Sequence, residues 1–161
     1  DSPSDLTALV ARLAAATDDG ERARAEWALG ERHHERGEPE AALRFLTEAR
    51  RRLAALDRGG DAARVEVALA EVCAARGDGA RALAFLERAL DHAEAEGDDA
   101  LRAEVQLALG EAAAARGDLA VARALATAAE AATLALRDRG GHARAAAALA
   151  RLTDDAVPAR A

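Results

Sequence analysis

The stretch Glu66-Val-Ala-Leu-Ala-Glu71 decides the fold, because the chain repeats it at a fixed interval. Related stretches are Glu26-Trp-Ala-Leu-Gly-Glu31 before it and Gln106-Leu-Ala-Leu-Gly-Glu111 after it, so the pattern begins at the evenly spaced positions 26, 66 and 106 without a gap. Repeats of this length are typical of stacked supersecondary units, none of which can bury its apolar face alone. The sequence therefore predicts a repeat array.

Working outward from this stretch, each repeat has the pattern of two helices. An Arg-Gly-acid triplet follows it at 36–38, 76–78 and 116–118. Its glycine can end the first helix in a left-handed conformation, and its acid favours the start of the next helix. The second helices share small residues, with a large apolar residue between them: Ala42, Phe45 and Ala49; Ala82, Phe85 and Ala89; Ala122, Leu125 and Ala129.

Both ends of the chain look like partial repeats. Residues 4–16 resemble a lone second helix, and residues 142–153 resemble a lone first helix. Short connections make neighbouring helices antiparallel. The prediction is an all-α stack of helical hairpins with about eight helices, forming one array over residues 1–161. The hairpins are expected at 21–57, 61–96 and 99–137, with first helices at 21–36, 61–76 and 99–116 and second helices at 39–57, 79–96 and 119–137.

Composition supports closely packed helices and excludes several classes of function. The chain is 51% hydrophobic but only 2% aromatic, with alanine dominant, and alanine has the highest helix propensity. Its net charge of −7 disfavours nucleic acid as a partner. The chain has a single cysteine, Cys73, so it cannot form an internal disulfide, and it has no apolar run long enough to cross a membrane. We expect a cytoplasmic protein.

The absence of Lys, Ile, Asn, Met and Tyr, whose codons are AT-rich, indicates a GC-rich bacterial gene. The chain begins at Asp1 without an initiator methionine, so we expect an excised piece of a longer protein or a processed product.

These residues resemble the tetratricopeptide repeat family. The resemblance rests on Leu29-Gly30, Leu69-Ala70 and Leu109-Gly110, on the glycine turns, and on the paired alanines, and it covers about residues 21–153. It implies a right-handed superhelical stack of hairpins, an α-solenoid. The 40-residue repeat is longer than the family's usual repeat, and is similar to long variants in multidomain bacterial regulators. A HEAT-like array is the alternative, because its repeat length also fits.

A second departure is in the first helices, where His33, Cys73 and Ala113 replace the family's common aromatic residue.

The resemblance also implies a concave groove lined by first helices, which would bind a peptide or helix carrying basic and apolar residues. Trp27 would be an aromatic anchor, and Glu31, Glu71 and Glu111 would form an acidic ladder. The alternative is that these glutamates are solvated or paired to nearby arginines, and that Trp27 packs under the N-terminal helix at residues 4–16. The groove candidates are Arg24, Trp27, Glu31, His34, Glu35, Arg64, Val67, Glu71, Glu104, Leu107 and Glu111.

Other chemistry has weaker support in the sequence. Glu31-Arg-His-His34 contains one Glu-x-x-His step, whereas di-iron bundles need a pair of them. Cys73 is expected to be a buried structural thiol. The Arg-Gly-Asp triplets are explained by helix ends, and the cluster Arg50–Arg52 is expected to be a solvated face. No catalytic, metal or cofactor site is predicted.

Two classes of function remain. The leading prediction is a protein–protein interaction module, one part of a larger bacterial regulator. The alternative is a self-assembling structural piece that forms a homodimer through the alanine-rich helix containing residues 143–150. An enzyme or small-ligand sensor would need a deep pocket, which alanine-dominated walls make hard to build.

Overall fold

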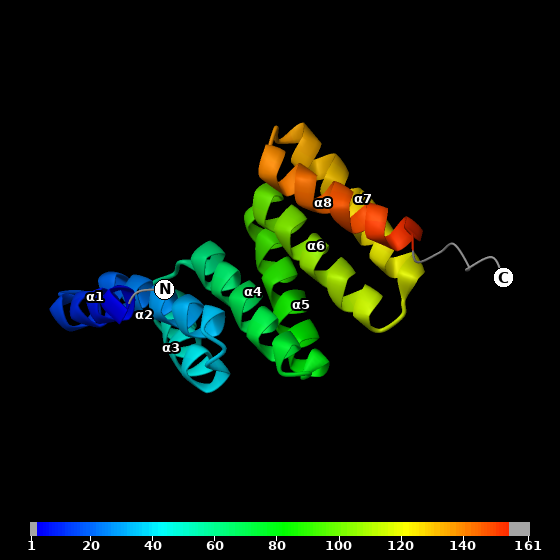
Figure 1. Ribbon diagram of the computed structural model, residues 1–161. Coiled ribbons are helices and arrows are strands. Elements are labelled where there is room, and N and C mark those ends of the chain that lie inside the picture. Colours follow the sequence, from blue (N-terminus) through cyan, green and yellow to red (C-terminus); the bar gives the residue numbers. More distant parts are fainter. Residues whose placement is uncertain (1–2, 155–161) are drawn as a thin grey trace. The chain divides into compact units, whose positions relative to one another are not determined.

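The computed structural model describes residues 3–154 and is entirely helical over that range apart from short turns, as predicted. The predicted helix boundaries agree closely with the observed ones. The helices are α1 Pro3–Ala15, α2 Asp19–Glu35, α3 Pro39–Ala55, α4 Gly59–Ala75, α5 Gly79–Glu96, α6 Asp99–Ala115, α7 Leu119–Ala135 and α8 Arg139–Asp154 (Figure 1).

The chain divides into two compact units, one ending at His92 and the other beginning at Ala93. In the first unit, α2 packs on α1 and on α3, α3 packs on α4, and α2 also contacts α4. This unit has a leucine core, in which Leu29, Leu46, Leu53 and Leu69 are at most 1% exposed. Neighbouring helices are therefore packed in sequence order (Figure 1).

The second unit repeats this packing with smaller side chains. Here α6 packs on α7, α7 packs on α8, and α6 also contacts α8. Its core is built on alanines of α7 and α8, such as Ala126, Ala129 and Ala145, with Leu107 and Leu152 beside them. The alanines contribute little apolar area each, so this core is thinner than the leucine core of the first unit.

Left-handed residues end the helices, and only some of them are the predicted glycines. Gly37 has φ +72°, and the amide of Glu38 donates to the carbonyl of His33 at 2.9 Å, which closes a Schellman motif. After α3 and α7, Asp57 and Arg137 take this conformation, each with φ +56°. The helix break therefore precedes the Gly-Gly pairs, and Gly59–Gly60 and Gly140–Gly141 lie inside α4 and α8.

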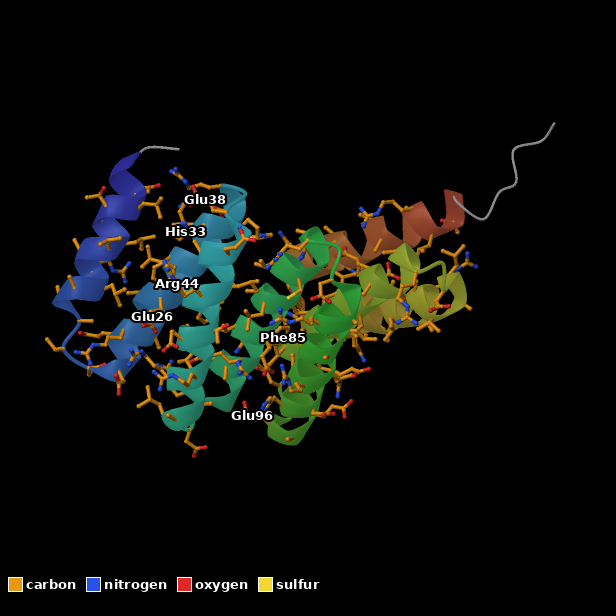
Figure 2. The ribbon with its side chains drawn as sticks, turned by 90° about the horizontal axis from the view of Figure 1, so that it is seen from below. Glu26, His33, Glu38, Arg44, Phe85 and Glu96 are labelled. Carbon is orange, nitrogen blue, oxygen red and sulfur yellow. The ribbon has the colours of Figure 1, made fainter. Side chains whose placement is uncertain are left out.

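The acidic residues of the turns do not all cap the helix that follows. Asp78 accepts a hydrogen bond from the amide of Arg81 at 3.1 Å and so caps α5. Glu38 and Asp118 make no such bond at the starts of α3 and α7. Glu38 instead contacts Nδ1 of His33 at 2.5 Å, and both side chains lie at the same end of the α2–α3 hairpin (Figure 2).

His33 also stacks on the Phe45 ring, with 5.3 Å between ring centroids. It therefore keeps an aromatic contact at the position where the family's common aromatic is missing.

Two buried glutamates join neighbouring helices of the first unit. Glu26 of α2 is 6% exposed, and its Oε2 accepts a hydrogen bond from Nε of Arg52 in α3 at 3.0 Å. Glu66 of α4 is 3% exposed. Its Oε1 lies 3.3 Å from Nη1 of Arg50 in α3 and 3.5 Å from Nε of Arg88 in α5. Buried carboxylates need such partners, because an unpaired charge in the interior is costly.

The arginine cluster was expected to be a solvated face, and this was wrong for Arg50 and Arg52. Both are partly buried and neutralise these glutamates. The middle residue, Arg51, remains exposed and pairs with Glu48 on its own helix at 2.8 Å.

A very close packing of two helices occurs at Gly30, where α2 meets α3. A Cβ at Gly30 would lie 2.5 Å from Cγ of Leu46, which is too close for two carbon atoms, so the leucine side chain would have to move. At Gly110, the same position two repeats later, the nearest atoms would be the carbonyl oxygen of Ala122 at 3.3 Å and Cβ of Leu125 at 3.4 Å. The two glycines therefore have different structural importance.

We predict that Gly30→Ala lowers the free energy of unfolding by about 1 kcal/mol, because overpacking against Leu46 outweighs the gain in helix propensity. Gly110→Ala should be neutral or stabilising, because its new methyl meets only ordinary or slightly tight contacts. Urea denaturation followed by circular dichroism measures both variants. Equal effects of the two substitutions would contradict this account of the α2–α3 contact.

Candidate functional site

Four predicted groove residues line one hollow in the first unit. Glu31, His34 and Glu35 follow one another at helical spacing on α2, so they share a face. Glu71, one repeat after Glu31, enters from α4, which contacts α2. The hollow has a volume of about 270 Å³ and is completed by Leu46, Ala68 and Val72. We call it the acidic hollow.

The acidic hollow carries more negative than positive charge. Three of its lining residues are glutamates, and Glu35 forms an ion pair with Arg32 at 2.6 Å. The apolar floor formed by Leu46 and Val72 excludes water on one side, which strengthens electrostatic attraction to a cation. This combination suits the cationic end of an arginine or lysine side chain.

Glu31 is held in place by Trp27, one helical turn before it. The indole Nε1 of Trp27 donates to Oε1 of Glu31 at 2.9 Å. Partial burial raises the pKa of Glu31, the bond from Trp27 opposes this rise, and the nearby charge of Glu35 adds to it. Trp27, the predicted aromatic anchor, is half-buried in the structure, and its indole bonds to this carboxylate.

The other predicted residues lie outside the acidic hollow. Arg24 lines a separate hollow of about 320 Å³ with residues of α1, including Arg12, and with Glu21 of α2. Arg64 donates to the carbonyl of Gly60 at 3.5 Å.

Val67 is 4% and Leu107 9% exposed, so both are core residues and a partner would reach little of either. Glu104 is exposed on α6, and Glu111 forms an ion pair with Arg151 of α8 at 3.6 Å.

Sequence reasoning missed a second hollow, which lies in the second unit among α6, α7 and α8. Its volume is about 230 Å³. We call it the apolar hollow, and its lining residues are Leu107, Gly110, Glu111, Ala114, Ala122, Ala126, Ala148, Arg151 and Leu152. The signal was present in the repeat alignment, because Ala126 stands where the first two repeats have Leu46 and Leu86.

Residues with other chemical potential have structural surroundings. Cys73 is 1% exposed, and burial raises the pKa of its thiol, which disfavours the reactive thiolate. Among residues 3–154, no three His, Cys, Asp or Glu side chains gather where they could hold a metal ion. None of the described helices has the length and apolar character needed to span a membrane.

Comparison with known proteins supports the repeat fold. The tetratricopeptide repeat family model matches residues 61–135, slightly less than half of the chain. The match supports assignment to that family. No curated protein matches the chain in sequence.

Solved structures similar to the chain include RapI and BtubC. The apo form of RapI superposes with a TM-score of 0.81 at 12% identity, over 93% of this chain and 43% of RapI. BtubC (BKLC) from P. vanneervenii superposes with a TM-score of 0.70 at 17% identity, over 96% of this chain and 74% of BtubC. These likenesses show the fold, a tetratricopeptide-like stack of helices. The chain spans less than half the length of the RapI structure.

We predict that Glu31→Gln stabilises the fold at neutral pH and has no effect near pH 3, which is below the ordinary carboxyl pKa of 4.5. A carboxyl whose pKa is raised on folding contributes stability at low pH, and this is lost as the pH rises through its ordinary value toward the raised one. The amide oxygen of glutamine can still accept the bond from Trp27. The measurement is the free energy of unfolding in urea across this pH range.

Glu38→Gln is the matched comparison with the opposite sign. Hydrogen bonds from His33 and then Arg36 lower the pKa of Glu38, so its contribution to stability is present above the ordinary value and disappears as the pH falls. This variant should therefore be less stable than the parent at neutral pH. A loss of stability at neutral pH in Glu31→Gln would contradict the inference that the charged form of Glu31 destabilises the folded protein.

Proposed function

We propose that this chain is a protein–protein interaction module whose acidic hollow binds a basic side chain of a partner peptide or helix. The observation that carries the proposal is the convergence of Glu31, His34, Glu35 and Glu71 over an apolar floor. The fold supports a scaffold, because stacked hairpins provide a preformed surface that loses little conformational entropy on binding. The role is non-enzymatic binding, without a cofactor.

The electrostatics of Glu31 fit a binding role better than a structural one. Its pKa is raised, so the charged form is held at a cost to the fold. Charges held in this way are enriched at functional sites. A guanidinium or ammonium group in the hollow would favour the ionised carboxylate and remove that cost. Binding of the basic partner should therefore weaken as the pH falls toward the pKa of Glu31.

The wider setting is also part of the proposal. The 40-residue repeat is similar to long variants in multidomain bacterial regulators, and we propose that the chain is a cytoplasmic module of such a regulator.

Selection of a random peptide library on the immobilised chain tests this function. We expect enriched peptides to require an arginine or lysine, to bind more weakly at high salt, and to lose about tenfold in affinity to Glu31→Gln/Glu71→Gln. The control is Glu87→Gln/Glu94→Gln, which removes the same charge from exposed positions of α5 outside the hollow. Peptides that bind both double variants equally would exclude the acidic hollow as their site.

Self-assembly is the second candidate, and for it we propose α7 as the surface in place of the predicted α8. The large exposed apolar side chains of this unit belong to α7 and the turn after it: Leu119, Val121, Leu134 and Leu136. The exposed positions of α8 carry Arg144 and Arg151 together with the small residues Ala143, Ala147 and Ala150. Exposed apolar side chains mark interaction sites where they form a contiguous patch.

If a homodimer forms, we expect Leu134→Glu to dissociate it without loss of helicity, because Leu134 is 65% exposed. Sedimentation velocity at several concentrations measures the change. A parent chain that stays monomeric at the highest concentration would eliminate this second candidate.

A further inference from the structure

A hollow of the opposite charge lies in the same unit as the acidic hollow. It is the hollow of about 320 Å³ between α1 and α2, and we call it the basic hollow, because Arg12 and Arg24 line it with a single acid, Glu21. Both hollows belong to the unit that ends at His92, and both include side chains of α2. The distance between them is therefore set by one helix.

The two arginines of the basic hollow are not used by the fold. Arg12 and Arg24 are exposed, and neither makes an ion pair or a side-chain hydrogen bond with any other residue that the structure describes. Arg50 and Arg52 of the same unit, in contrast, neutralise buried glutamates. A guanidinium group stays charged at any physiological pH, so the basic hollow carries two positive charges without an ion-pair partner in this part of the chain.

The acids nearest to Arg24 in the chain are held by the start of α2. Glu21 accepts hydrogen bonds from the amide of Thr17 at 2.9 Å and from its hydroxyl at 3.1 Å. Asp18 accepts a hydrogen bond from the amide of Glu21 at 2.8 Å. Both carboxylates therefore have partners already. A carboxylate from outside the chain is the group that a free guanidinium binds best, through two parallel hydrogen bonds.

Arg24 lies in line with two acids of the acidic hollow. Glu31 follows it by seven residues and Glu35 by eleven on α2. At 3.6 residues per turn, both lie within about 20° of Arg24 around the helix axis. The rise along α2 from Arg24 to Glu31 is about 10 Å, and the small residue Ala28 lies between them. One face of α2 therefore has a positive end and a negative end.

We propose that the basic hollow binds an acidic side chain of the same partner whose basic side chain occupies the acidic hollow. This inference rests on the proposed function, and it adds a second charge to the partner at a defined separation. An acid and a base about 10 Å apart are about three residues apart in an extended peptide, or about two turns apart in a helix. Because the two ends of the face differ in sign, the partner binds in one direction, with its acid toward the N-terminal end of α2.

Removal of the two arginine charges tests the inference. We expect peptides selected on the parent chain from the random library to carry an Asp or Glu at a constant spacing from the required Arg or Lys. These peptides should lose about tenfold in affinity to Arg12→Gln/Arg24→Gln. The variant should melt at the same temperature as the parent, because both side chains are exposed.

The control is Arg44→Gln/Arg81→Gln, which removes the same charge from exposed positions of α3 and α5 outside both hollows. Its affinity for the selected peptides should equal that of the parent. Undiminished binding to Arg12→Gln/Arg24→Gln, or equal losses to the two arginine variants, overturns the inference.

Charge reversal separates direct contact from a general effect of net charge. A selected peptide whose acid is replaced by lysine should bind the parent about tenfold more weakly. It should recover affinity on Arg12→Gln/Arg24→Glu, which places a carboxylate in the basic hollow, whereas the unmodified peptide should show the reverse preference. A lysine peptide that gains no affinity on this variant overturns the inference.

The two proposals fail in different ways in this experiment. Peptides that lose affinity to Glu31→Gln/Glu71→Gln but not to Arg12→Gln/Arg24→Gln would retain the proposed function and overturn the basic hollow as a second contact. Peptides that lose affinity only to the arginine variant would exclude the acidic hollow, and with it a partner held at both points. Peptides that depend on both hollows, and on neither control, support both proposals.

Discussion

The close approach of neighbouring helices at small residues is the constraint on which the structure depends. Ala42, Ala49, Ala122 and Ala129 are all at most 1% exposed, and each lies where one helix meets the next. A buried methyl contributes only on the order of 0.8 kcal/mol, so these residues act mainly by letting the helix backbones come close. Larger residues such as Leu29 and Leu69 then fill the remaining space. Helix spacing leaves little tolerance for a change of side-chain size.

This constraint explains why the acidic hollow and the apolar hollow differ although the backbone repeats. Alanines and glycines at fixed places hold the helices at a constant spacing. A change of side-chain size at another position therefore changes the shape of the surface and not the helix packing. Leu46 lies in the lining of a hollow with three glutamates in the first unit, and Ala126 lies in the lining of a mostly aliphatic hollow in the second. A repeat architecture can therefore vary its binding chemistry position by position without altering its packing.

Charge is used in two separate ways on the same helix. Glu26 and Glu31 both lie on α2, but Glu26 is buried and neutralised by Arg52, whereas Glu31 is turned toward solvent and held by Trp27. Glu26 joins α2 to α3, whereas Glu31 lies among other acidic side chains of the hollow. The arginines at 50 and 52 belong to the internal group, so they do not neutralise the rim of the acidic hollow.

The sequence by itself determined the helices, their order and which side chains share a face of one helix. Helix ends depend on residues next to them in the chain, and Glu31, His34 and Glu35 share a face because of helical spacing alone. It did not determine burial, because whether Val67 or Leu107 reaches solvent depends on side chains from other helices.

Only the tertiary structure revealed the partners of Arg50 and Arg52, the left-handed Asp57 and Arg137, and the apolar hollow. A hollow is a property of several helices at once: Gly110, Ala126 and Ala148 are ordinary residues in their own helices, and only their meeting leaves a space.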